Sequence, residues 1–196
     1  MKTLEVLAKF KAAFMLLGIG LLLMQPVGCA NARPRFSRFW AARSFPVTLL
    51  LDSDIEESRR AEIILAAHTW NEEVGTNVFV IETTEISDYI YYGDIIEEPG
   101  HREIFVRETE LGRADGEDIL LGLAHRIYVD DHLTGCIIEL DNDLARESIY
   151  PVSLHELGHC LGLEHDPNIN SVMFEYVLRS SGDIEEEDLE FIRRQL

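Results

Sequence analysis

The first regular pattern in the chain is a strand, a helix and a second strand in close succession. Residues 45–51 form a nearly continuous apolar run of strand length. Ser53 followed by Glu56 has the spacing of a capping box and predicts the start of a helix. Apolar side chains then recur at helical spacing, at Ile63, Ala67, Trp70 and Val74. Gly75 predicts the end of this helix, and residues 78–81 predict the next strand. This order predicts a parallel pair of strands in an α/β fold.

The second half of the chain contains more strand patterns than helical patterns. Strands are predicted at residues 88–92, 103–109, 123–129 and 136–140, with residues 130–135 connecting the last two. A carboxylate-rich loop at residues 113–118 is typical of either a calcium site or a solvated turn. The chain closes on apolar positions that approximate a helical stripe behind residues 181–183, namely Ile184, Leu189, Ile192 and Leu196. These positions predict a short final helix.

The N-terminal residues have the pattern of an export signal. An uncharged run covers residues 12–24, and it follows three lysines, Lys2, Lys9 and Lys11. A helix of this length spans about 20 Å, which is too short for a bilayer and typical of the core of a signal peptide. We therefore predict a signal peptide over residues 1–32, an N-terminal arm over residues 33–44 and one folded domain over residues 45–196.

The end of the signal has two alternative interpretations. Residues 30–32 offer the small-x-small pattern of ordinary signal cleavage. Residues 27–29 resemble the end of a bacterial lipoprotein box, in which Cys29 is lipidated and becomes the new N-terminus. Pro26 stands where that box usually has leucine. In both cases we expect an exported protein, secreted or periplasmic, whose only predicted link to a membrane is the lipid anchor at Cys29.

The charge of the chain restricts its partners. The formal net charge is −19, and because the three lysines and Glu5 give residues 1–28 a local +2, the rest carries −21. Such an acidic surface repels phosphate backbones and anionic headgroups, so we expect no nucleic-acid partner. Solubility, calcium sites and basic substrates are alternative explanations of the acidity.

Two cysteines remain once the signal segment is set aside. Cys136 and Cys160 form an even pair in an oxidising compartment, which favours a disulfide between them. Such a bridge would close a loop of about 25 residues and stabilise the fold by roughly 3.5 kcal/mol in the chain-entropy model. The alternative is two buried thiols that pack as small hydrophobic groups.

The segment from His155 to Asp166 contains the candidate chemistry. His155 and His159 are four residues apart, so on a helix they project from one face and can share a zinc ion. Glu156 lies about 100° around the axis, where it can hold a water without being a ligand. Gly162 permits a positive φ, so the helix can end there and His165 can reach the same metal. Three neutral imidazoles leave one position open, as in a catalytic zinc site.

These residues resemble the zinc signature of the metzincin metalloproteases, and most of all that of the matrixin group. Residues 171–174 resemble the Met-turn of that family, which places Met173 below the metal as a hydrophobic base. The short interval between His165 and Met173 is typical of matrixins. The resemblance covers residues 45–196, strongly at 155–173 and weakly at 85–120.

The resemblance also implies a substrate-binding edge. Leu123 and Ala124 match the edge strand along which an extended peptide would pair, although an ordinary interior strand is the alternative. Tyr176 is expected either in the wall of the pocket beside the zinc or in the core. His125 matches one ligand of the structural zinc of matrixins, but Glu139 falls where a histidine would be expected. We therefore predict a single, catalytic zinc.

The resemblance implies a metzincin-like α/β fold, with a twisted mixed sheet, a long capped helix, a zinc helix at about residues 151–161 and a small C-terminal subdomain from near Gly162. It implies a zinc endopeptidase in which the metal activates a water and Glu156 accepts its proton as general base. We expect a peptide or protein substrate and a monomeric enzyme. The alternative hypothesis is a catalytically inactive, zinc-stabilised adhesion or inhibitor module on the cell surface.

Overall fold

A computed structural model of the protein describes residues 39–41, 44–84, 102–114 and 118–196. The proposed signal peptide, Cys29 and the strand predicted at residues 88–92 lie outside the described residues and stay predictions. Across the described ranges, no helix is both long enough and apolar enough to cross a bilayer.

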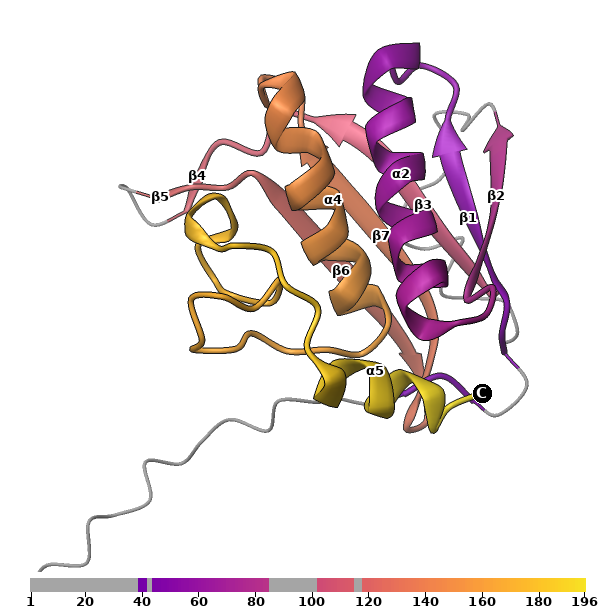
Figure 1. Ribbon diagram of the computed structural model, residues 1–196. Coiled ribbons are helices and arrows are strands. Elements are labelled where there is room, and N and C mark those ends of the chain that lie inside the picture. Colours follow the sequence, from indigo (N-terminus) through magenta and orange to yellow (C-terminus); the bar gives the residue numbers. More distant parts are fainter. Residues whose placement is uncertain (1–38, 42–43, 85–101, 115–117) are drawn as a thin grey trace, which may run out of the picture. The chain divides into compact units, whose positions relative to one another are not determined.

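The described residues form two sheets and a small number of helices, drawn in Figure 1. In chain order the elements are β1 (Val47–Asp52), α2 (Glu57–Val74), β2 (Phe79–Thr84), β3 (Glu103–Thr109), β4 (Arg113–Ala114), β5 (Asp118–Ile119), β6 (Gly122–Val129), β7 (His132–Asp141), α4 (Arg146–Cys160), the 3-10 turn η1 (Val177–Arg179) and α5 (Glu186–Arg193).

The main sheet is mixed, with the strand order β2-β1-β3-β7-β6. The first four strands are parallel to one another, and β6 pairs antiparallel with β7 at the edge. The predicted parallel pair of β1 and β2 is thus confirmed. The predicted connection at residues 130–135 is wrong, because β7 begins at His132 and only Asp130 and Asp131 form the turn, with Asp130 at φ 53°.

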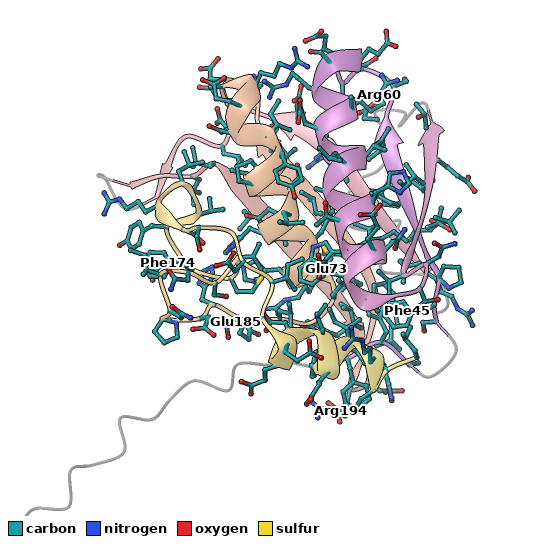
Figure 2. The ribbon with its side chains drawn as sticks, in the orientation of Figure 1. Phe45, Arg60, Glu73, Phe174, Glu185 and Arg194 are labelled. Atoms are coloured by element: carbon teal, nitrogen blue, oxygen red, sulfur yellow. A yellow bond between two sulfur atoms is a disulfide. The ribbon has the colours of Figure 1, made fainter. Side chains whose placement is uncertain are left out.

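Helix α2 follows the predicted apolar stripe but not the predicted cap. All four predicted stripe residues are buried, and Gly75 ends the helix in the left-handed region at φ 86°. The capping box is wrong: the N-cap residue is Glu56, which makes no side-chain cap hydrogen bond, and Ser53 lies in the turn before it. Arg60, labelled in Figure 2, donates instead to the carbonyls of Ser53 and Ile55 and so stabilises that turn.

Helix α4 begins earlier than the sequence suggested. It starts at Arg146, so Pro151 lies inside the helix rather than at its start. Because proline has no N–H, the helix lacks one internal hydrogen bond at that point, and the helix nevertheless continues. Helices α2 and α4 lie side by side on one face of the main sheet (Figure 1). The Trp70 indole donates to the Leu154 carbonyl at 3.0 Å and joins the two helices.

The core lies between this helical layer and the sheet. Alternate sheet residues with exposures of 1% or less point into it, namely Leu49, Leu51, Ile104, Val106, Ile138 and Leu140. The predicted N-terminal arm also contributes to the core, because Trp40 is only 1% exposed. At the other end, Leu189 and Ile192 of α5 are buried as predicted, whereas Leu196 is 51% exposed because the helix ends at Arg193.

Candidate metal centre and its cleft

Three imidazoles converge beside the C-terminal half of α4. His155 and His159 lie one helical turn apart on α4, and His165 comes from the loop that follows, so that the candidate ligand atoms of the three all lie within 4.8 Å of one another. The Nε2 atom of His155 is 3.1 Å from that of His159 and 3.3 Å from that of His165. Tetrahedral zinc with Zn–N bonds of 2.0–2.1 Å places its nitrogens about 3.3 Å apart. The three residues therefore fit a zinc ion.

Backbone carbonyls orient two of these rings. His155 Nδ1 lies 2.7 Å from the Val172 carbonyl, and His159 Nδ1 lies 2.8 Å from the Leu163 carbonyl. A carbonyl only accepts, so each Nδ1 carries the proton and each Nε2 presents a lone pair to the centre. Burial lowers the pKa of His155 to about 4 and lowers that of His159 well below its usual range. Both rings are therefore neutral at pH 7, as metal ligands must be.

The turn after α4 brings in the third ring. Gly162 has φ 99°, a conformation that glycine adopts without strain. The Leu163 N–H donates to the Gly158 carbonyl at 3.0 Å, which closes the helix end, and the chain then reverses towards His165. His165 is exposed, unlike His155. The structure thus brings together all three predicted ligands.

Met173 lies against the helix that carries His155 and His159. It is fully buried, and its N–H donates to the Ser171 hydroxyl at 3.0 Å. A Cβ added to Gly158 would come within 2.5 Å of the Met173 sulfur. Only glycine at position 158 therefore lets the methionine pack this closely below the metal centre, as the predicted Met-turn requires.

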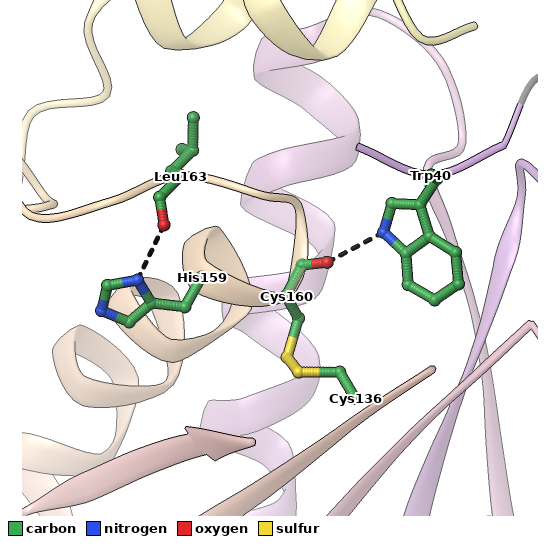
Figure 3. Close-up of a disulfide and its surroundings, with 5 residues drawn as sticks. All are labelled: Trp40, Cys136, His159, Cys160 and Leu163. Atoms are coloured by element: carbon green, nitrogen blue, oxygen red, sulfur yellow. Dashed lines mark hydrogen bonds between the residues drawn. A yellow bond between two sulfur atoms is a disulfide. The ribbon is translucent and has the colours of Figure 1, made fainter. Parts of the chain in front are cut away.

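The C-terminal end of α4 is held by three further groups, the first two of which are drawn in Figure 3. Cys160 forms a disulfide with Cys136 of β7, with Cα atoms 5.7 Å apart. The Trp40 indole donates to the Cys160 carbonyl at 2.8 Å. Gln195 accepts the backbone N–H of Trp40 at 3.0 Å and donates to the Leu161 carbonyl at 3.3 Å. The helix end next to His159 is therefore held by the sheet, the arm and the C-terminus.

Glu156 lies next to His155 and faces β6. Its side chain is buried, with 6% of the residue exposed, and it accepts the backbone N–H of Ala124. Burial raises the pKa of this carboxyl to about 8, and the bond from Ala124 offsets only part of that effect. A buried carboxyl beside an imidazole cluster can accept and release a proton near neutral pH.

A cleft of about 710 Å³ opens above the three imidazoles. One wall is the edge strand β6 with the residues just before it, from Leu120 to Ala124, and the other wall is the segment from Glu175 to Arg179. Leu123, Ala124 and Tyr176, which the sequence assigns to substrate binding, all line it. Tyr176 is 43% exposed, with the Arg179 guanidinium 5.2 Å from its ring centroid.

A second polar cluster lies on the other face of the sheet. Glu139, 7% exposed, accepts hydrogen bonds from Arg107 and contacts His125 Nε2 at 2.8 Å. Burial would raise the pKa of Glu139, but the bonds from Arg107 and His125 outweigh it and lower the pKa. Within the described part of the chain, His155, His159 and His165 form the one group that could hold a metal ion. The candidate calcium loop includes residues 115–117, which lie outside the described residues.

Sequence reasoning missed three residues that shape this site. Trp40 falls in a stretch without periodicity, and Gly122 lies just before the strand predicted at residues 123–129. Gly158 offered a signal, because a glycine inside a helical pattern usually marks a close contact. Arg126 and Glu164 add an ion pair at 2.9 Å that joins β6 to the loop just before His165.

Comparisons with known proteins agree with this geometry. The matrixin family model matches residues 105–195. A stretch of 51 residues is 37% identical to Matrix metalloproteinase-A of Caenorhabditis elegans. The matched stretch makes up 26% of this chain and 10% of the length of that protein. The crystal structure of archaemetzincin from Methanopyrus kandleri superimposes with a TM-score of 0.50 at 17% identity, over 84% of this chain and 98% of that chain. The predicted resemblance to metzincins, and among them to matrixins, is therefore confirmed, as is the metzincin-like α/β fold.

Proposed function

We propose that this protein is a zinc-dependent endopeptidase. The observation that carries the proposal is the convergence of three imidazoles, in which the His155 Nε2 atom lies 3.1 Å and 3.3 Å from those of His159 and His165, with the buried carboxyl of Glu156 beside them in an open cleft. A site that only stabilises the fold would be closed by a fourth protein ligand. The cleft instead leaves room for a substrate next to the metal position.

His155, His159 and His165 would hold the zinc ion. When bound there, zinc would lower the pKa of a water molecule and polarise the carbonyl of the scissile bond. A cation at the imidazoles also favours the charged form of the neighbouring Glu156, whose pKa burial raises in the protein alone. Glu156 would then be ready as a carboxylate when the site is loaded.

Glu156 would move the proton that hydrolysis requires. Its carboxylate accepts a proton from the attacking water as the new C–O bond forms at the scissile carbonyl carbon. The same carboxyl then donates that proton to the amide nitrogen as the C–N bond breaks, which releases an amine and a carboxylic acid. The second proton of the water, which the acid still carries, passes to the amine or to solvent. Glu156 therefore acts first as the base and then as the acid, and the reaction requires no second acidic side chain.

The edge strand β6 would align the substrate. Its outer edge faces the cleft, where an extended peptide can add as an antiparallel strand. Backbone pairing would place the scissile carbonyl over the imidazoles, and the wall around Tyr176 would contact a side chain of the peptide. We also propose that the enzyme acts outside the cytoplasm as a monomer, freely secreted or anchored through lipidated Cys29.

The decisive experiment replaces Glu156 with glutamine. Glu156→Gln keeps the size of the side chain and all three imidazoles but removes the group that accepts a proton. We expect cleavage of a diverse peptide pool to fall by about 10²–10⁴-fold, while zinc content and thermal stability stay close to wild type. Chelation should abolish cleavage by the wild-type protein, and added zinc should restore it.

Two outcomes would contradict the proposal. If Glu156→Gln cleaves peptides as fast as the parent, another group or a contaminant performs the reaction. If the zinc-loaded wild-type protein cleaves no peptide but melts at a lower temperature after chelation, the zinc-stabilised adhesion or inhibitor module is the better hypothesis.

A further inference from the structure

The outer edge of β6 contacts Glu156 directly. The Leu121 carbonyl accepts the Asp141 N–H at 3.0 Å, so the backbone groups of Leu121 point towards β7. Backbone groups alternate sides along an antiparallel strand, so those of Gly122 and Ala124 point away from β7 into the cleft. The Ala124 N–H donates to the Glu156 carboxylate. An amide that a pairing peptide would use is thus already bonded to the candidate base.

Gly122 provides the space that Glu156 occupies. A Cβ at this position would lie 2.8 Å from both Cγ and Oε1 of Glu156, and 2.8 Å from Cγ1 of Val152. Side-chain atoms do not approach this closely, so any other residue at position 122 would displace the carboxyl, Val152 or the strand. The carboxyl therefore rests against the strand because position 122 has no side chain.

We propose that Gly122 and Ala124 position Glu156 for proton transfer, and that a peptide pairing with β6 takes over the Ala124 amide and frees the carboxylate. The catalytic half of this inference, that Gly122 and Ala124 position Glu156 for proton transfer, rests on the proposed function. The other half, the contact of Glu156 with β6, does not. Glu156 thereby becomes available as a base when a peptide substrate pairs with β6. Proton transfer and substrate alignment are thereby coupled through one backbone amide.

The contact can be tested in the metal-free protein by hydrogen exchange. A net internal hydrogen bond corresponds to about two- to tenfold in exchange rate. We expect the Ala124 amide to exchange at least about twofold faster in Glu156→Ala than in wild type, and faster also in Gly122→Ala. Glu175→Ala is the matched control, because it removes another, exposed carboxylate from the cleft wall opposite β6. An Ala124 amide that exchanges equally in wild type and Glu156→Ala would overturn the inference, as would an equal acceleration in Glu175→Ala.

The catalytic half is tested with the zinc-loaded protein and whichever peptide the wild type cleaves from a mixed pool. Misplacing a reacting group by a fraction of an ångström to 1 Å costs up to about 100-fold in rate. We expect Gly122→Ala to lower kcat by about 10- to 100-fold, with KM within about threefold of wild type and an unchanged zinc content.

A double variant separates the two clashes. Gly122→Ala with Val152→Ala relieves the contact with Val152 alone, so kcat should stay low. Wild-type kcat in either Gly122→Ala or the double variant would overturn the positioning role. If Gly122→Ala does not fold, the exchange of Ala124 in Glu156→Ala still decides the contact. A wild-type protein that cleaves nothing would refute the proposed function, yet the exchange result would stand on its own.

Discussion

Two of the candidate metal ligands come from a helix and the third comes from an irregular loop, and these two regions hold their imidazoles differently. His155 is 3% exposed, and its Nδ1 donates to a backbone carbonyl, as does that of His159. His165 is exposed. Its place in the loop is fixed by the next residue, because the Asp166 N–H donates to the Met173 carbonyl at 2.8 Å.

This difference shows which ligands of the metal centre are placed by local helical structure and which ligand is placed by the tertiary fold. The spacing of His155 and His159 places both rings on one face wherever α4 is helical. His165 reaches them only if Gly162 turns the chain and the segment around Met173 pairs with the loop. The helical pair should therefore bind metal by itself, and the loop should add the third ligand once the fold is complete.

The largest effect is expected from removing single ligands. His159→Ala should lose zinc on dialysis and reduce peptide cleavage to background, because the helical pair is broken. His165→Ala should also lose cleavage, but it should retain zinc at least about tenfold more tightly than His159→Ala because two preoriented rings remain. Competition with a chelator of known affinity measures both dissociation constants. Equal affinities, or weaker binding by His165→Ala, would show that the helix does not preorganise the site.

A smaller effect should follow from removing the disulfide next to the helical ligands. Replacing Cys136 and Cys160 together with serine releases the loop that the bridge closes, at a cost of roughly 3.5 kcal/mol in the chain-entropy model. A domain of this size should then melt roughly 10 °C lower. Zinc affinity should fall as well, because Cys160 directly follows His159. Calorimetry and chelator competition measure the two effects, and an unchanged melting temperature would contradict the prediction.

Periodic patterns predicted much of the fold because they report local structure. The stripe on α2 was buried as predicted, and β3 has the bounds that its apolar pattern indicated, Glu103–Thr109. The zinc motif could be predicted for the same reason. His155 and His159 are four residues apart, which is about one helical turn, and Gly162 allows the chain to turn after the helix. Errors fell at element boundaries, such as the start of α4 before Pro151.

Contacts between distant segments could not be predicted from such patterns. Gly122 matters because β6 passes close to α4, and nothing in its neighbouring residues indicates that approach. Glu139 was recognised as a departure from the matrixin pattern, but its ion pair with Arg107 depends on β3 and β7 being neighbours. Trp40 lies 120 residues from the carbonyl it binds. Pairings of this kind follow from the complete fold rather than from spacing.

The smallest effect expected is that of Trp40→Phe, which tests the end of the zinc helix. Phenylalanine keeps an aromatic ring in the core but cannot donate to the Cys160 carbonyl, which then loses the bond observed at 2.8 Å. A buried carbonyl left without its partner costs about 1–3 kcal/mol, so the urea midpoint should fall accordingly. Zinc affinity should stay near wild type, because the disulfide and the bond from His159 to Leu163 still hold the helix end.

A control for Trp40→Phe lies one residue away. Phe39 is 49% exposed, so Phe39→Leu should change the free energy of unfolding by less than about 0.5 kcal/mol. If Trp40→Phe weakened zinc binding by tenfold or more while the urea midpoint barely moved, the arm would be acting on the ligands themselves. The helical pair would then depend on distant contacts as much as His165 does, and the contrast between helix and loop would no longer hold.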